Sequence, residues 1–381
     1  MRSDAISIGS SREVEIAAAE KNLVSFLMDL EAKVRALECW ARRDITVKPL
    51  SEAGIEGLGE GRTNHNFIVT VTHHDGAERK FFVRLGDDLP AYGVSRKREE
   101  GAMCVAAAQG IGAGVIHTEP GALVQELLPG KALTAAEVKA ALAPDGDAPL
   151  LKALASTLRK LHGAPMPPEI PMPGIADRKW APRDLLRWLT LAKDGGYTRI
   201  PIVADAEALL GEVDAFLGTP PCAAFCHFDL LPDNFVVEQE GPMVPPDVKI
   251  VDFEYANSGP PLMDLTIFSM GCELTVEEET VLLTSYYSEP AIKWETKLPT
   301  IDDAFLAKFG ALKVLACLRE TLWGVVAEVS GTSALSASEA IAYTDLNYAK
   351  LGKARALFEA SKVTFPEGVG VAPDPIDGVE M

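Results

Sequence analysis

One stretch near the middle of the chain constrains the fold more than any other. Residues 225–235 read FCHFDLLPDNF, and residues 248–255 read VKIVDFEY. In the first segment an acid, Asp229, precedes an amide, Asn234, by five positions, and short apolar runs flank the pair. The second segment is a strand pattern that ends in another acid, Asp252. Short runs of β-branched and aromatic residues are typical of strands, so the pattern predicts a polar loop followed by a hairpin.

Phosphoryl transfer from ATP needs the three kinds of side chain that this pattern supplies. One carboxylate, here Asp229, would accept the proton of an attacking hydroxyl, while Asn234 and Asp252 would hold Mg²⁺ on the phosphates. The alternative is that the acids stabilise turns and that Asn234 and Asp252 cap neighbouring elements. Each residue taken alone fits the alternative better, but the ordered set favours phosphoryl transfer.

The exact residues of the two segments also match a known pattern. Residues 226–235, CHFDLLPDNF, together with 251–256, VDFEYA, resemble the choline/ethanolamine kinase family. That family belongs to the aminoglycoside-phosphotransferase-like, protein-kinase-like small-molecule kinases, and weaker similarity extends from Asn64 to Tyr348. The resemblance implies an α+β, bilobal protein-kinase-like fold, with a small antiparallel β lobe and a larger, mostly helical lobe. It also implies ATP and Mg²⁺ as cofactors.

Four parts of the chain are expected on this basis. They are an N-terminal helical extension (1–44), a small nucleotide-binding β lobe (45–127), a large helical lobe with the catalytic loop and substrate site (128–365), and a flexible tail (366–381). Apolar residues recur at helical spacing over Val14–Arg43, which predicts an amphipathic helix. Such a helix packs either on the body of the protein or on a second subunit, in which case the chain forms a homodimer.

The spacing of apolar residues predicts where the remaining strands and helices lie. Strand patterns occupy Val47–Leu50, Asn66–Thr72, Lys80–Leu85 and Ala122–Leu127, and residues 74–77 suit a hairpin turn. Helical patterns cover Ser95–Gln109, Leu150–His162, Asp184–Lys193, Asp205–Leu217, Val276–Tyr287, Ile301–Val329 and Ala337–Ala360. His162 is expected to be a packed core or helix-end histidine and not a ligand. Asp264 is expected to begin a buried helix and to brace the catalytic loop backbone, although a plain helix cap would place the same residue there.

Bulk properties limit the partners and the location. The formal net charge is −19, which disfavours nucleic acid or an anionic membrane surface as partner because both attract a positive field. The six cysteines show no CxxC pair and no metal-type spacing, as in proteins that keep their thiols reduced. The N-terminus has no apolar signal core, and no run of about 18 uncharged apolar residues exists. We therefore expect a cytoplasmic protein without membrane insertion.

Two segments of the small lobe are predicted to bind the nucleotide. Residues 57–64 read GLGEGRTN, and glycine lets backbone N–H groups approach phosphate oxygens. Alone, this segment would be an ordinary glycine-rich hairpin more often than not. The family carries G-x-(T/S)-N-x-N here, which Gly61, Thr63 and Asn64 resemble. By their position in the sequence alone, Gln125, Glu126 and Leu128 are predicted to contact the edge of the adenine ring.

An arginine stands where protein kinases carry the lysine that binds the phosphates. Arg84 lies in the third strand pattern, and Arg can bind phosphate oxygens through two parallel hydrogen bonds. The choline-kinase-like family often has Arg at this place. One acid of the following helix is expected to orient Arg84, and Glu99 is preferred to Glu100.

The acceptor is predicted from both chemistry and resemblance. The quaternary ammonium of choline has no N–H donors, so its site needs aromatic faces and carboxylates. The family forms part of this pocket with a W-x-x-W helix; here residues 320–326 read ETLWGVV, so Trp323 is kept and Glu320 replaces the first Trp. With Glu254 and Tyr255, these residues are the predicted substrate site. We expect a small cationic alcohol, choline first and ethanolamine second.

Two other hypotheses stay open. The chain could be a kinase of another small molecule in the same fold, such as an aminoglycoside, thiamine or a sugar. It could also be a catalytically silent kinase-fold module that only binds a nucleotide. The retained Asp229, Asn234 and Asp252 argue against the silent module.

Overall fold

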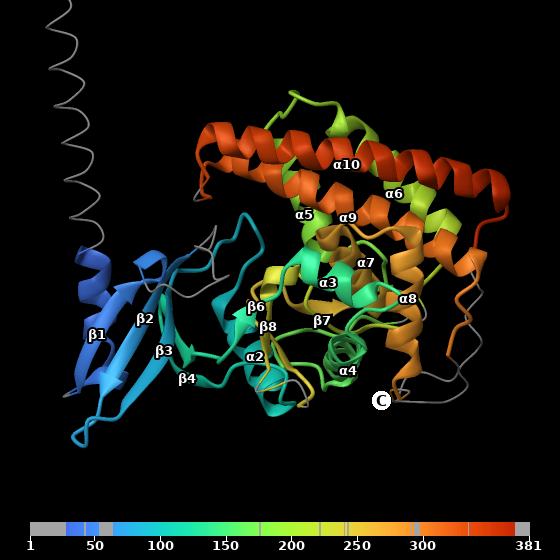
Figure 1. Cartoon of the computed structure of the whole chain (residues 1–381). Coiled ribbons are helices and arrows are strands. Elements are labelled where there is room, and N and C mark those ends of the chain that lie inside the picture. Colours follow the sequence, from blue (N-terminus) through green and yellow to red (C-terminus); the bar gives the residue numbers. More distant parts are fainter. Residues whose placement is uncertain are drawn as a thin grey trace, which may run out of the picture. The chain divides into compact units, whose positions relative to one another are not determined.

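The computed structural model describes residues 28–41, 43–52, 64–174, 177–220, 222–239, 241, 244–290, 292, 298–333 and 335–369. These residues form two compact units. The first holds the described residues of Met1–Ile55, Gly59–Gly86 and Ile116–Leu127, and the second holds those of Asp87–Val115 and Leu128–Met381. Antiparallel sheet and helices together confirm the predicted α+β class (Figure 1).

The first unit is built on a five-stranded sheet with the order β1-β2-β3-β5-β4. Its strands are β1 (Asp44–Pro49), β2 (His65–Thr72), β3 (Glu78–Leu85), β4 (Val115–Glu119) and β5 (Ala122–Glu126). The pairs β1–β2, β2–β3 and β3–β5 are antiparallel. The predicted turn joins β2 to β3: the His73 N–H donates to the Ala77 carbonyl at 2.8 Å, and Gly76 adopts a φ of 84° that favours glycine.

The N-terminal helical segment packs on this sheet. Residues 28–36 are helical, and the buried side chains of Leu30, Val34 and Trp40 join Phe81 and Val83 in one apolar core. The rings of Trp40 and Phe81 lie 5.2 Å apart between centroids. Of the two predicted packing modes, the described part of this segment follows the first, against the body of the protein. Residues 14–27 and 42 lie outside the described residues.

The second unit is mostly helical. Its helices are α2 (Arg96–Ala108), α3 (Ala135–Leu142), α4 (Ala148–Gly163), α5 (Arg183–Asp194), α6 (Ile202–Leu217), α7 (Pro261–Cys272), α8 (Val276–Ser288), α9 (Asp303–Ser330) and α10 (Ala337–Thr364). Two small sheets, β6-β8-β9 and β10-β7, consist of β6 (Lys131–Ala132), β7 (Ala224–Cys226), β8 (Phe235–Glu238), β9 (Asp247–Ile250) and β10 (Asn257–Gly259). Helix α9 is buried along most of its length, and α10 lies beside it (Figure 1).

Helix α2 belongs to the second unit, although the sequence places residues 87–115 in the small lobe. Side-chain bonds explain this difference. Arg96, at the start of α2, forms an ion pair with Glu254 at 3.0 Å, and Arg98 donates to the Glu254 carbonyl at 3.2 Å. A sequence boundary drawn between strands and helices cannot foresee these long-range bonds. Among the described residues, no helix is both long enough and apolar enough to cross a membrane.

Candidate active site

The three residues predicted to carry the chemistry come together. The Asn234 side-chain amide donates to the Asp229 carbonyl at 2.7 Å and lies 3.4 Å from the Asp229 carboxylate. The Val251 N–H donates to the Asn234 carbonyl at 3.0 Å, which brings the backbone just before Asp252 close to Asn234. The β8–β9 hairpin produces this arrangement, because β8 starts directly after Asn234 and β9 ends directly before Val251.

A buried carboxylate holds the loop in place. Asp264, in the first turn of α7, accepts from the His227 N–H at 2.7 Å and from the Phe228 N–H at 2.8 Å. His162 contacts the same carboxylate at 3.2 Å through Nε2 and the Tyr286 hydroxyl at 2.8 Å through Nδ1. Both the bracing role of Asp264 and the core position of His162 are confirmed.

The backbone is strained at two points of this site. Phe228 has a φ of 60° and Asp252 a φ of 64°, a conformation that side-chain-bearing residues rarely adopt. Such strain costs of order 1–3 kcal/mol per residue and persists only where the surroundings enforce it. Gly259 makes room for the Phe228 ring, because a Cβ there would lie 2.3 Å from it. Strained residues gather at functional sites, so their presence here supports a functional loop.

His227 packs beneath the loop as a neutral side chain. Burial lowers its pKa to about 4. Its Nε2 donates to the Val251 carbonyl at 3.0 Å, and its Nδ1 accepts from the Asp229 N–H at 3.2 Å. The ring therefore ties Asp229 to the strand that precedes Asp252.

The carboxyl of Asp229 titrates near neutrality. Burial raises its pKa to about 7, against the opposing effect of the Arg319 guanidinium, while the charges of Glu320 and Glu254 raise it further. A base that acts near neutral pH performs best with a pKa in this range. Arg319 is thus part of the electrostatic environment of the site.

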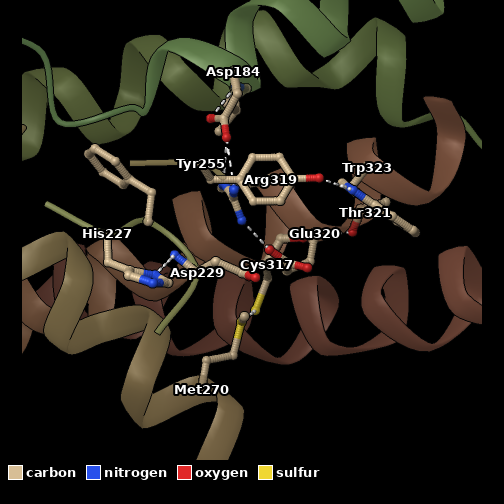
Figure 2. Close-up of polar contacts among 12 residues, drawn as sticks. Asp184, His227, Asp229, Tyr255, Met270, Cys317, Arg319, Glu320, Thr321 and Trp323 are labelled. Carbon is tan, nitrogen blue, oxygen red and sulfur yellow. Dashed lines mark hydrogen bonds and ion pairs between the residues drawn. The ribbon is translucent and has the colours of Figure 1, made fainter. Parts of the chain in front are cut away.

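Arg319 is the main residue that the sequence did not reveal. Its buried guanidinium donates to Asp184 through Nε and Nη2, at 3.0 and 2.8 Å, and to Glu320 through Nη1, at 2.6 Å (Figure 2). It also lies 5.0 Å from the ring centroids of both Trp188 and Tyr255. The sequence signal was an Arg-Glu pair inside the otherwise uncharged stretch 314–327 of this helix, which is a sign of a buried charge pair.

Three of the four predicted substrate residues also gather here. The Trp323 indole N–H donates to the Tyr255 hydroxyl at 2.9 Å (Figure 2). The Glu320 carboxylate, already bonded to Arg319, accepts from the Tyr343 hydroxyl at 2.5 Å. All three side chains are buried and bonded to other groups of the chain.

The fourth predicted substrate residue, Glu254, has a different partner. Its carboxylate pairs with Arg96 at 3.0 Å, and the same Arg96 Nη1 pairs with Glu99 at 2.8 Å. Glu99 and Glu254 are thereby linked through one guanidinium. Glu99 is buried, as expected of an orienting acid, but its predicted partner Arg84 belongs to the first unit, and that pairing stays a prediction.

Four of the other predicted nucleotide residues, Asn64, Arg84, Gln125 and Glu126, belong to the first unit. Arg84 is buried on β3, where it pairs with Asn66 of β2 in the sheet register. Gln125 is buried and Glu126 is exposed at the end of β5. The remaining predicted residues are Asn64 and Leu128, which are half-buried, and Gly61 and Thr63, which lie outside the described residues.

Comparison with known proteins identifies the family. The model of the phosphotransferase enzyme family, abbreviated APH, matches residues 54–292. The chain belongs to this phosphotransferase family. The matched range contains Asp229, Asn234 and Asp252, and the family agrees with the resemblance inferred from the sequence. No curated protein matches the chain.

Solved structures share the phosphotransferase fold. A choline/ethanolamine kinase family protein from Mesorhizobium loti is 20% identical, with a TM-score of 0.61, and the match covers 90% of this chain and 99% of that one. The choline kinase LicA from Streptococcus pneumoniae is 18% identical, with a TM-score of 0.58 and coverage of 85% and 99%. A GDP complex of an aminoglycoside phosphotransferase is 15% identical, with a TM-score of 0.54 and coverage of 84% and 97%. At these identities the likeness establishes the protein-kinase-like fold.

Proposed function

We propose that this phosphotransferase transfers the γ-phosphoryl group of ATP to a hydroxyl of a small molecule, with Mg²⁺ as cofactor. The observation that carries the proposal is the convergence of Asp229, Asn234 and the strand end at Asp252 on a loop braced by Asp264. Phosphoryl transfer depends mainly on positioning and on electrostatic stabilisation. A loop held by buried hydrogen bonds meets the first of these needs.

Asp229 acts as the base in this proposal. Its carboxylate accepts, or orients, the proton of the acceptor hydroxyl as the oxygen attacks the γ-phosphorus. Its pKa of about 7 leaves an ionised fraction at neutral pH that is able to take the proton. The bond from the Asn234 amide fixes the orientation of the loop around it.

The donor atoms at this site fit a magnesium ion. Because the Asn234 side-chain N–H₂ donates to a carbonyl, its Oδ1 is the atom left to act as a ligand. The Asp252 carboxylate supplies a second oxygen, and Mg²⁺ prefers oxygen ligands. Asn234 and Asp252 would therefore hold the ion, which when bound neutralises charge on the phosphates.

Nucleotide use is supported by the relatives. Related structures contain AMP or GDP: LicA has been solved with AMP, and an aminoglycoside phosphotransferase with GDP. In this chain Arg84 and the segment containing Gly61, Thr63 and Asn64 are the proposed phosphate contacts, and Gln125, Glu126 and Leu128 the proposed adenine contacts. ATP is the proposed phosphoryl donor.

The identity of the acceptor molecule is the more specific part of the proposal. The sequence resemblance favours choline, then ethanolamine, while the solved relatives include both choline and aminoglycoside kinases. Aromatic and acidic residues do gather near Asp229, as a site for a cationic alcohol requires. Each of them, however, already has a bonded partner in the chain.

A coupled ADP-release assay tests the proposal. Choline, ethanolamine, thiamine, aminoglycosides and neutral sugars are each supplied with Mg-ATP, and release that depends on the acceptor is the expected result. An Asp229→Asn variant controls for contaminating ATPase activity. A thermal shift with Mg-ATP but no acceptor-dependent ADP release from any alcohol would favour the silent binding module instead.

A further inference from the structure

We propose that Arg319 permanently occupies a cation cage beside Asp229. We infer that the acceptor is therefore an uncharged hydroxyl compound and does not place an ammonium group in this part of the site. The cation cage consists of Asp184, Trp188, Tyr255 and Glu320. The inference rests on the proposed kinase function, because it names the class of acceptor for the same site.

The cage has the chemistry that recognises an organic cation. Asp184 and Trp188 lie one turn apart on α5, so they face the same side of that helix. The rings of Trp188 and Tyr255 are nearly perpendicular, at 86°, and their centroids lie 6.0 Å apart. Two aromatic faces and two carboxylates around one point attract an ammonium or a guanidinium. The group found there is the Arg319 guanidinium, 5.0 Å from each ring.

Every carboxylate oxygen of the cage already accepts a hydrogen bond. One carboxylate oxygen of Asp184 accepts from Arg319, and the other accepts from the Leu185 N–H at 2.8 Å. One oxygen of Glu320 accepts from Arg319, and the other accepts from the Tyr343 hydroxyl. An incoming ammonium would have to displace one of these bonds and leave a buried charge without its partner, which is costly.

Arg319 also lies within electrostatic range of Asp229, because the charge of each group acts on the other. Figure 2 draws Asp229 together with Asp184, Tyr255, Arg319 and Glu320. In a small amino-alcohol the hydroxyl and the cation are only two carbons apart. A hydroxyl at Asp229 would therefore place its ammonium close to Arg319, which repels it.

Direct binding of tetramethylammonium tests the cage without any turnover. This ion carries the charge of choline but no hydroxyl, and calorimetry on the full chain measures its affinity. We expect no saturable binding to the wild type and saturable binding to Arg319→Met, at least about tenfold tighter than to the wild type. Arg199→Met is the matched control, since Arg199 also bridges two acids, Glu328 and Asp345, but is exposed.

A second measurement guards against a variant that does not fold. Guanidinium or methylguanidinium, at concentrations well below those that denature, should raise the melting temperature of Arg319→Met or Arg319→Ala, because it refills the cage. Neither compound should raise that of Arg199→Met. If the Arg319 variants are insoluble, the wild-type titration alone still decides, because saturable tetramethylammonium binding to the wild type would overturn the proposal.

The ADP-release assay with several acceptors is the third test. Neutral polyols or sugars should release ADP with a higher kcat/KM than choline or ethanolamine. Choline as the best acceptor of the wild type would overturn the inference while upholding the kinase function. ADP release with no alcohol at all would count against the kinase function, whereas the tetramethylammonium titration would still report on the cage.

Discussion

At the scale of single residues, the proposed chemistry depends on the Asp229 carboxyl. Asp229→Asn removes the proton acceptor and keeps the shape of the side chain. We expect turnover to fall by about 10²–10⁴-fold, the usual contribution of a positioned base. Nucleotide binding should change little, because Asn234 and Asp252 remain. Steady-state kinetics and a Mg-ATP titration by calorimetry measure the two effects, and unchanged turnover would remove Asp229 from the role of base.

The raised pKa of Asp229 predicts how activity depends on pH. The base must be ionised to accept a proton, and its pKa in the free protein is about 7. We expect kcat/KM to rise with pH through about 7 and then to level off. A rate profile between pH 5 and pH 9 measures this. A profile that is flat across neutral pH would show that the titration of Asp229 does not limit the reaction.

The same carboxyl should also make stability depend on pH. Its pKa is near 4 in an unfolded chain and about 7 in the fold, so the folded state binds more protons between these values. The free energy of unfolding should therefore fall as the pH rises from about 4 to about 7, as far as this group contributes. Urea unfolding at two pH values should show a smaller fall for Asp229→Asn than for the wild type.

At the scale of elements, Asp264 ties helix α7 to the catalytic loop. Asp264→Ala would leave the buried N–H groups of His227 and Phe228 without their acceptor. We expect a loss of about 2–4 kcal/mol in the free energy of unfolding, together with reduced turnover. Asp302→Ala is the control for a plain helix cap: its exposed carboxylate caps α9 and should cost about 1 kcal/mol without reducing turnover. Equal losses for the two variants would mean that Asp264 is only a cap.

The contact between α9 and α10 depends on one glycine. A Cβ at Gly324 would lie 2.5 Å from the Thr344 hydroxyl and 3.1 Å from the Thr344 Cα. Gly324→Ala should therefore destabilise the protein by about 1–3 kcal/mol, because the helices must move apart. Gly310, also in α9, has no atom within 4 Å of its Cβ position, so Gly310→Ala should stabilise by up to about 1 kcal/mol. Thermal or urea unfolding of the two variants measures the difference in stability. Equal effects on the free energy of unfolding would contradict close packing at Gly324.

At the scale of the whole molecule, ligand binding should stabilise the folded chain. A ligand that binds only the native state raises the melting temperature with its concentration. Mg-ATP should do so in the wild type, and chelation of Mg²⁺ by EDTA should reduce the shift. Asp252→Asn, which weakens the proposed metal site, should show the reduced shift even with Mg²⁺ present. A full shift in this variant would remove Asp252 from the metal site.

The sequence by itself determined most of the long elements and the order of the proposed catalytic residues. The spacing from Asp229 to Asn234 and the strand pattern before Asp252 are local properties, so a short window of sequence carries them. The same holds for the helical periodicities, which predicted α4, α5, α6, α8, α9 and α10 to within a few residues at each end.

The tertiary structure alone decided which charges meet. Arg319 reaches Asp184 across 135 positions of sequence, and Arg96 reaches Glu254 across 158. These pairs depend on how the helices pack and on the loss of water around each charge, and neither effect leaves a periodic signal in the sequence. For the same reason the sequence could select aromatic and acidic residues for a cationic substrate, while only the fold placed the guanidinium of Arg319 among Asp184, Trp188, Tyr255 and Glu320.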